Sequence, residues 1–190
     1  MSTRIEFLIN AIKEVQETNR FLDTKAGVLV ALESSLLIVA ISSLTDTSRL
    51  QLIKNLIGSG NTGYLAFLAA YFIVYAIALV LHILIMLKII FPTEDPEAHV
   101  HLGDFQPRRL FFLHTLDQSR RIEPPVPEYF SQLAAMSDDD ITKEYAFELL
   151  KLSFIRKVKS DGLAFSFRFL GVLIIGIAVF GLLLALGGLI

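Results

Sequence analysis

The sequence predicts an all-α, polytopic membrane protein with three transmembrane helices and a cytosolic helical bundle. Hydrophobic residues make up 54% of its 190 residues, more than the roughly 45–50% that is typical of soluble domains. They are concentrated in the runs 26–44, 64–87 and 169–190. Each run is close to the ~20 residues that a helix needs to cross a bilayer. We therefore expect these runs to be the three membrane spans.

The distribution of lysine and arginine predicts how the chain is oriented. Eleven of its 17 Lys and Arg residues lie in 88–168, four in 1–25 and only two in 45–63. Because positively charged segments stay in the cytoplasm, 88–168 is expected to be a cytosolic helical region and 45–63 an external loop. The N-terminus is then cytoplasmic, and the third span carries the C-terminus to the outside.

The junction between residues 1–25 and the first span is the next informative feature. Residues 3–25 have the apolar periodicity of an amphipathic helix. With no proline or glycine before Gly27, this helix is expected to run into the span. Asp23 and Lys25 fit a solvated boundary pair, with Lys25 reaching the headgroups. Alternatively, Asn19, Asp23 and Lys25 form part of a cytosolic pocket.

Two ionisable residues interrupt the apolar runs. Glu33 lies about two turns inside the first span, where a carboxylate costs about 2.5–3 kcal/mol on insertion scales. It is expected to make an interhelical hydrogen bond, helped by Ser34 and Ser35, or to line a path for ions or water. His82, near the inner end of the second span, is interpreted as a satisfied interfacial histidine.

The segment 92–107 is predicted to be a loop, since it contains three prolines and a glycine. Its His99 and His101 match the spacing of no standard metal site. The chain has no cysteine, which excludes thiolate chemistry and disulfides. No metal or cofactor is therefore expected.

A long cytosolic helix is predicted from Ile141 to Gly162, with Ser137 as its N-cap and Asp138–Asp140 in its first turn. Its last turns and the residue just before the third span carry a cluster of basic residues: Lys151, Arg156, Lys157, Lys159 and Arg168. This cluster either lies near anionic headgroups or binds a phosphate-bearing ligand.

The third span has small residues at regular intervals. Gly171, Ala178 and Ala185 repeat every seven residues, and Gly181 and Gly188 occupy intermediate positions. Small residues let helix backbones approach closely in lipid. The stripe therefore predicts either packing on the first two spans or an oligomer face.

Several of these features together resemble the Pycsar effector transmembrane family. They are the helix that runs through residues 23–27 into the first span, the Phe-Phe-Leu-His cluster at 111–114, and the long helix with Arg156-Lys157 followed at once by a span. The acidic, proline-rich segment 92–107 is the part that resembles the family least. The resemblance implies a bacterial inner-membrane effector of anti-phage defence. Such effectors are activated by cCMP or cUMP made by a partner cyclase, and they impair membrane integrity.

Asp23, Lys25, Phe112, His114 and Lys157 occupy positions that match the family. For a cyclic mononucleotide bound to the cytosolic helices, Arg156 and Lys157 would supply positive charge to the phosphate. Phe112 and Tyr145 are candidate platforms for the base, and Asn19, Asp23 and His114 are candidates to hydrogen-bond it. The partners expected are therefore a cyclic pyrimidine mononucleotide, the lipid bilayer and further copies of the chain, without a nucleic-acid polymer.

The sequence contains no catalytic motif, with neither HExxH, GxSxG nor a Walker loop. An enzyme is therefore not expected. Two alternatives to a ligand-gated effector stay open: a membrane anchor or scaffold that docks a partner protein, and a small ion channel subunit with Glu33 as its gate.

Overall fold

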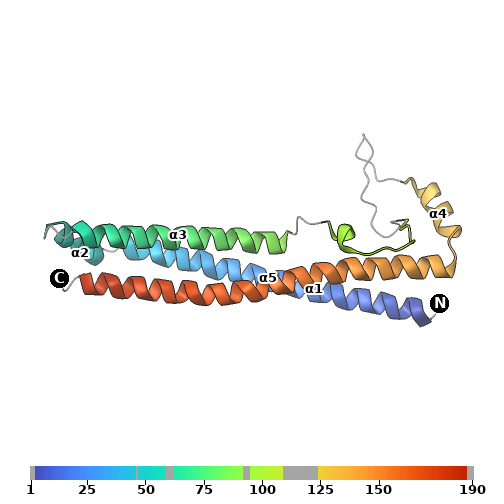
Figure 1. Ribbon diagram of the computed structural model, residues 1–190, viewed down its shortest axis with the longest axis horizontal. Coiled ribbons are helices and arrows are strands. Elements are labelled where there is room, and N and C mark those ends of the chain that lie inside the picture. The colour runs from blue at the N-terminus through green and yellow to red at the C-terminus, as the bar shows by residue number, and fades with distance from the viewer. Residues whose placement is uncertain (1–2, 46, 59–61, 92–94, 109–123, 188–190) are drawn as a thin grey trace. The chain divides into compact units, whose positions relative to one another are not determined.

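The computed structural model describes residues 3–45, 47–58, 62–91, 95–108 and 124–187. These ranges contain helices and connecting segments but no strand, which confirms the all-α prediction. The elements in chain order are α1 (Thr3–Thr45), α2 (Thr47–Gly58), α3 (Thr62–Ile90), a 3₁₀ helix (Pro96–His99), α4 (Val126–Ala134) and α5 (Asp138–Gly187) (Figure 1).

Three of these helices are long and apolar enough to cross a membrane. They are α1, α3 and α5, and each contains an 18-residue window of high mean hydropathy with few charges. Many large apolar side chains on these helices are exposed, among them Ile38, Val74 and Ile175. Exposed apolar surface of this extent is expected on helices whose solvent is lipid.

The long helices join segments that the sequence divides between water and lipid. Helix α1 is continuous over 43 residues, so the predicted run of the N-terminal helix into the first span is confirmed. Helix α5 is continuous over 50 residues and includes both the predicted helix 141–162 and most of the run 169–190. Gly162 does not end it, since a glycine inside a helix costs only about 1 kcal/mol relative to alanine.

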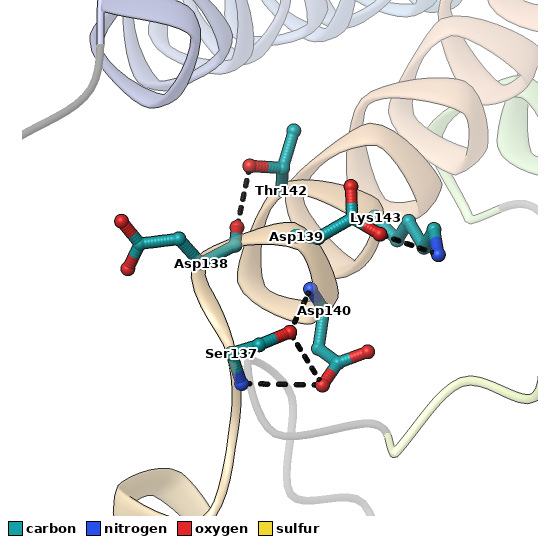
Figure 2. Close-up of polar contacts among 6 residues, drawn as sticks. All are labelled: Ser137, Asp138, Asp139, Asp140, Thr142 and Lys143. Atoms are coloured by element: carbon teal, nitrogen blue, oxygen red, sulfur yellow. Dashed lines mark hydrogen bonds and ion pairs between the residues drawn. The ribbon is translucent and has the colours of Figure 1, made fainter.

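The start of α5 confirms the N-cap predicted at Ser137 (Figure 2). The Ser137 hydroxyl accepts a hydrogen bond from the Asp140 backbone N–H at 3.2 Å, and the Ser137 N–H donates to Asp140 Oδ2 at 3.2 Å. The Ser137 hydroxyl also donates to Asp140 Oδ2 at 2.9 Å, and this bond, together with that from the Ser137 N–H, lowers the pKa of Asp140. Lys143 forms an ion pair with Asp139 at 2.6 Å, and this interaction raises the pKa of the lysine. The reciprocal cap satisfies backbone donors that an uncapped helix leaves unpaired.

Three prolines, Pro124, Pro125 and Pro127, predict a stiff break at residues 123–128, but the chain forms helix α4 from Val126 onward. The helix begins directly after Pro125 and contains Pro127 in its first turn. Proline is tolerated there because the first turn of a helix has no intrahelical acceptor for those N–H groups. The prolines thus initiate a short helix instead of only interrupting the chain.

The chain forms two compact units. Unit 1 comprises Met1–Phe21 and Thr93–Val158, and unit 2 comprises Leu22–Pro92 and Lys159–Ile190. Helices α1 and α5 contribute residues to both. The two units correspond approximately to the segments predicted to be cytosolic and membrane-spanning, and each is described separately below.

Unit 2 packs α1, α3 and α5 together through side chains spaced three and four residues apart. On α1 the buried positions include Ala26, Leu29, Glu33 and Ala40, and on α3 they include Leu68, Tyr75, Leu79, His82, Met86 and Ile89. This spacing is typical of the narrow apolar seam of a coiled coil. The remaining faces of the three helices are then available to lipid.

Contacts along α3 and α5 define their antiparallel arrangement. The hydroxyl of Tyr64 donates to the Leu183 carbonyl at 2.5 Å, and that of Tyr71 donates to the Gly176 carbonyl at 2.9 Å. A Cβ placed on Gly162 would come within 2.7 Å of the Ile89 side chain. Gly162 therefore allows α3 and α5 to approach closely at this end of unit 2.

Candidate functional site

The residues predicted to bind a ligand are divided between the units. Unit 1 contains Asn19, Tyr145, Arg156 and Lys157, and unit 2 contains Asp23 and Lys25. Phe112 and His114 lie outside the described residues. Arg156 and Lys157 are exposed, and Tyr145 is half-buried.

Asn19 joins α1 to α5 within unit 1. Its side chain is 9% exposed, and its Nδ2 donates to the Leu152 carbonyl at 3.4 Å. Its Oδ1 is buried and has no hydrogen-bond partner among the described residues. An unpaired buried amide oxygen costs about 1–3 kcal/mol. Asn19 therefore links the two helices through its Nδ2 and has an oxygen that can accept a hydrogen bond from a ligand.

Asp23 has a partner that the sequence did not suggest. Its Oδ1 lies 2.5 Å from Nζ of Lys159 on α5. The Lys159 side chain is only 8% exposed, whereas that of Asp23 is 38% exposed. The pair therefore neutralises a buried lysine. Lys159 differs in this from Arg156 and Lys157, whose side chains are exposed.

Unit 1 also contains a cluster of buried charges that sequence analysis missed. Glu144, Glu148 and Lys151 lie on successive turns of α5 and are 1%, 3% and 7% exposed. Lys151 Nζ is 2.5 Å from Glu148 Oε1 and 3.4 Å from Glu97 Oε1. Burial raises the pKa of Glu148, although the nearby Lys151 acts in the opposite direction. The spacing of three and four residues was the signal that could have shown them on one helix face.

Glu144 has one oxygen with a partner and one without. Its Oε1 accepts a hydrogen bond from the backbone N–H of Arg108. Its Oε2 is buried and has no hydrogen-bond partner among the described residues. A carboxylate oxygen that is removed from water in this way is ready to accept a hydrogen bond from a ligand N–H.

A cavity of about 520 Å³ lies next to Glu144. Its volume is within the range of roughly 300–1,000 Å³ that is usual for small-molecule sites. The charged residues that line it are Asp104, Arg108, Asp140, Lys143 and Glu144, and Phe105, Leu102 and Met136 supply apolar surface. The combination can accommodate a ligand that has an anionic group, a flat apolar face and hydrogen-bond donors.

The two histidines of the predicted loop do not form a metal centre in the structure. His99 instead stacks on Phe154, with ring centroids 4.2 Å apart. Within the described ranges, no group of three or more His, Cys, Asp or Glu residues is placed to hold a metal ion.

The membrane-embedded Glu33 has a different partner from the one expected. Ser34 and Ser35 donate to the carbonyls of Val30 and Ala31 on their own helix. Oε1 of Glu33 instead lies 2.7 Å from Nδ1 of His82 on α3, and both side chains are 0% exposed. His82, interpreted from the sequence as a satisfied interfacial histidine, is fully buried in unit 2 beside this carboxylate.

The stripe of small residues on α5 is open in the single chain. Gly171, Ala178 and Ala185 are exposed, Gly181 is half-buried, and Gly188 lies outside the described residues. A Cβ added to Gly171 or Gly181 would meet no heavy atom within 4 Å. The close contacts within unit 2 are made by Gly162 and Gly176 instead, which leaves the stripe available to another copy of the chain.

Comparison with known protein families matches residues 7–187 to the Pycsar effector protein domain. The match covers both units and almost the entire chain. Neither the comparison with curated proteins nor the comparison with solved structures finds a match.

Proposed function

This chain belongs to the Pycsar effector protein family, and from that premise we propose that it is a bacterial inner-membrane effector of anti-phage defence. In this proposal unit 1 binds a cyclic pyrimidine mononucleotide, cCMP or cUMP, on the cytoplasmic side. The spanning helices of unit 2 respond by impairing the membrane. The chain itself acts without catalysis.

The cavity beside Glu144 is the observation that supports a ligand in unit 1. Arg108 and Lys143 line it and provide positive charge for the single phosphate. The ion pair with Asp139 raises the pKa of Lys143 further above neutral pH, where the ammonium is already protonated. The unpaired Oε2 of Glu144 can accept a hydrogen bond from the base, either from the amino group of cytosine or from the ring N–H of uracil.

The two longest helices, α1 and α5, give a physical route by which a ligand bound in unit 1 can affect the spanning helices of unit 2. Helices α1 and α5 both contain residues of unit 1 and residues of unit 2. A ligand that changes how α1 and α5 pack in unit 1 acts on helices that continue into unit 2. Such a ligand shifts the effector between two states by as much as its affinities for them differ.

Calorimetric titration of the purified protein with cCMP and with cUMP tests the ligand site. Lys143→Ala and Glu144→Gln are each expected to weaken binding about tenfold to a hundredfold. This range corresponds to the roughly 1.5–3 kcal/mol of a hydrogen bond to a charged group. Glu128→Gln, the same chemical change at an exposed carboxylate of α4, is the control and should bind like wild type.

The same titration distinguishes the cavity from the site predicted by sequence. If Lys157→Ala weakens binding while Lys143→Ala and Glu144→Gln do not, the ligand binds at Arg156 and Lys157 instead. Failure of the wild type to bind either nucleotide would contradict the proposal and favour the scaffold alternative.

We propose that the open stripe on α5 mediates self-association of the effector. Gly181→Leu is expected to weaken the oligomer, because a side chain at this position faces open space in the single chain and separates neighbouring backbones. Gly176→Leu is a contrasting variant. It should disturb unit 2 itself, since a Cβ at Gly176 would lie 3.1 Å from Tyr75. Native mass spectrometry gives the number of copies, and an unchanged assembly for Gly181→Leu would contradict this interface.

A further inference from the structure

Unit 2 contains a set of three polar side chains at fully buried positions, one from each spanning helix. They are Glu33 on α1, His82 on α3 and Ser166 on α5, and each is 0% exposed. Buried polar groups in a membrane span are costly, and they commonly mark ion or proton pathways. These three side chains have no role in binding the nucleotide as proposed above.

The short distance between Glu33 and His82 favours a bound proton. Glu33 Oε1 and His82 Nδ1 lie 2.7 Å apart without the geometry of a hydrogen bond, and two lone pairs at this distance would repel each other. A carboxylate beside a neutral imidazole would also leave a net charge buried between apolar helices. The neutral assembly is either a carboxylic acid with an imidazole or a carboxylate with an imidazolium, and both contain the same additional proton.

Unit 2 has three further buried polar atoms on these side chains that are able to exchange protons. Glu33 Oε2, His82 Nε2 and Ser166 Oγ are buried and have no hydrogen-bond partner among the described residues. Imidazole can accept a proton at one nitrogen while it releases another from the opposite nitrogen. A serine hydroxyl both donates and accepts, so each of the three helices supplies a group capable of proton exchange.

Two clusters of apolar side chains in unit 2 keep water and protons away from these polar groups while the helices are packed. One cluster contains Ala26, Leu29, Met86, Ile89, Leu163 and Leu170, and another contains Tyr75, Leu79 and Leu173. On α3, His82 lies between Leu79 of one cluster and Met86 of the other. The Phe169 ring covers the imidazole at a centroid distance of 4.7 Å. Protons cannot cross these clusters while the helices remain packed.

From this arrangement we infer that Glu33, His82 and Ser166 form a proton-binding site through which unit 2 conducts protons when its helices separate. In either assembly His82 Nε2 carries a proton, so conduction begins when Nε2 releases it, and a proton taken up by Glu33 Oε2 then restores the net charge of zero. The opening step rests on the proposed function, whereas the presence of the bound proton does not. The effector would then impair the membrane by dissipating the proton gradient while larger solutes are retained.

Proteoliposomes with a pH-sensitive dye inside, under a potassium diffusion potential, test conduction. Adding cCMP or cUMP to the wild type is expected to speed proton entry. Glu33→Gln should reduce this entry at least tenfold, and Ser166→Ala should also slow it. Ser35→Ala is the matched control on α1, because its hydroxyl is exposed and bonds its own helix, so it should conduct like wild type. Proton entry in Glu33→Gln equal to that of the wild type would overturn the inference, as would release of trapped calcein together with protons.

Two further measurements separate this inference from the proposed function. If neither nucleotide opens the wild type, the Gly162→Leu background provides a wedge between α3 and α5 that needs no ligand. Glu33→Gln should then abolish proton entry in that background. In the ligand-free protein, the ¹⁵N resonances of His82, assigned with His82→Gln, should shift in Glu33→Gln. Unshifted resonances would show that no proton is shared, whatever the nucleotide response.

Discussion

Gly162→Leu is expected to destabilise unit 2 by about 1–3 kcal/mol, the usual cost of overpacking a well-packed core. Even a Cβ at this position would lie 2.7 Å from Ile89 Cγ1 and 2.8 Å from its Cδ1. Ile89 is 6% exposed and belongs to a core cluster, so its side chain has little room to move. The small gain in helix propensity on replacing glycine, about 1 kcal/mol or less, offsets only part of the cost.

Thermal unfolding in detergent measures this effect, with two comparisons. Gly27→Leu on α1 is the control, because a Cβ at Gly27 meets nothing within 4 Å, and it should leave the midpoint unchanged or slightly raised. Adding Ile89→Ala to Gly162→Leu should recover part of the loss by making room. A Gly162→Leu variant as stable as the wild type would mean that α3 and α5 do not approach closely at this point.

Asp23→Ala is expected to destabilise unit 2 by about 2–3 kcal/mol, because it leaves the buried Lys159 ammonium without a counter-charge. This value is below the roughly 3–5 kcal/mol typical of fully buried pairs, since Asp23 is partly exposed and water already screens it. Lys159→Met removes the charge but keeps a long apolar side chain. It should cost less than 1.5 kcal/mol, because the remaining aspartate is partly solvated.

The asymmetry between these two variants is the test. Midpoints of thermal unfolding should fall clearly for Asp23→Ala and little for Lys159→Met, and the double variant should resemble Lys159→Met. If both single variants lost equal stability, the ion pair itself would be the main contribution and the burial of Lys159 would be unimportant. Glu14→Ala, on an exposed position of the same helix, controls for changes in α1.

Local sequence was sufficient to predict the helices. The three apolar runs, the absence of a helix breaker before Gly27, and the Ser137 cap all act within a few residues of one another. The sequence also predicted that Glu33 would face protein or water instead of lipid, because the cost of a lipid-exposed carboxylate does not depend on which neighbour relieves it. The exception was α4, where the prolines indicated a break in the chain and not the start of a helix.

Partners distant in sequence were decided by tertiary structure. Glu33 and His82 are 49 residues apart, and Asp23 and Lys159 are 136 apart. Neither pairing follows from periodicity, because an apolar run shows which face is buried but not which helix, or which register, lies against it. The glycines follow the same rule: the regular stripe suggested close packing, yet the contacts within the chain are at Gly162 and Gly176.

The sequence by itself thus determined an all-α membrane protein with three helices able to span a bilayer, and it contained the motifs that resemble its family. Hydrophobic burial in lipid and helix capping depend on composition and short spacing, so one chain segment suffices to predict them. The paired charges, the cavity beside Glu144 and the buried set around His82 were decided only by the packing of α1, α3 and α5 and the chain beside them. These features depend on side chains from separate segments meeting within about 3 Å, a distance that no linear pattern specifies.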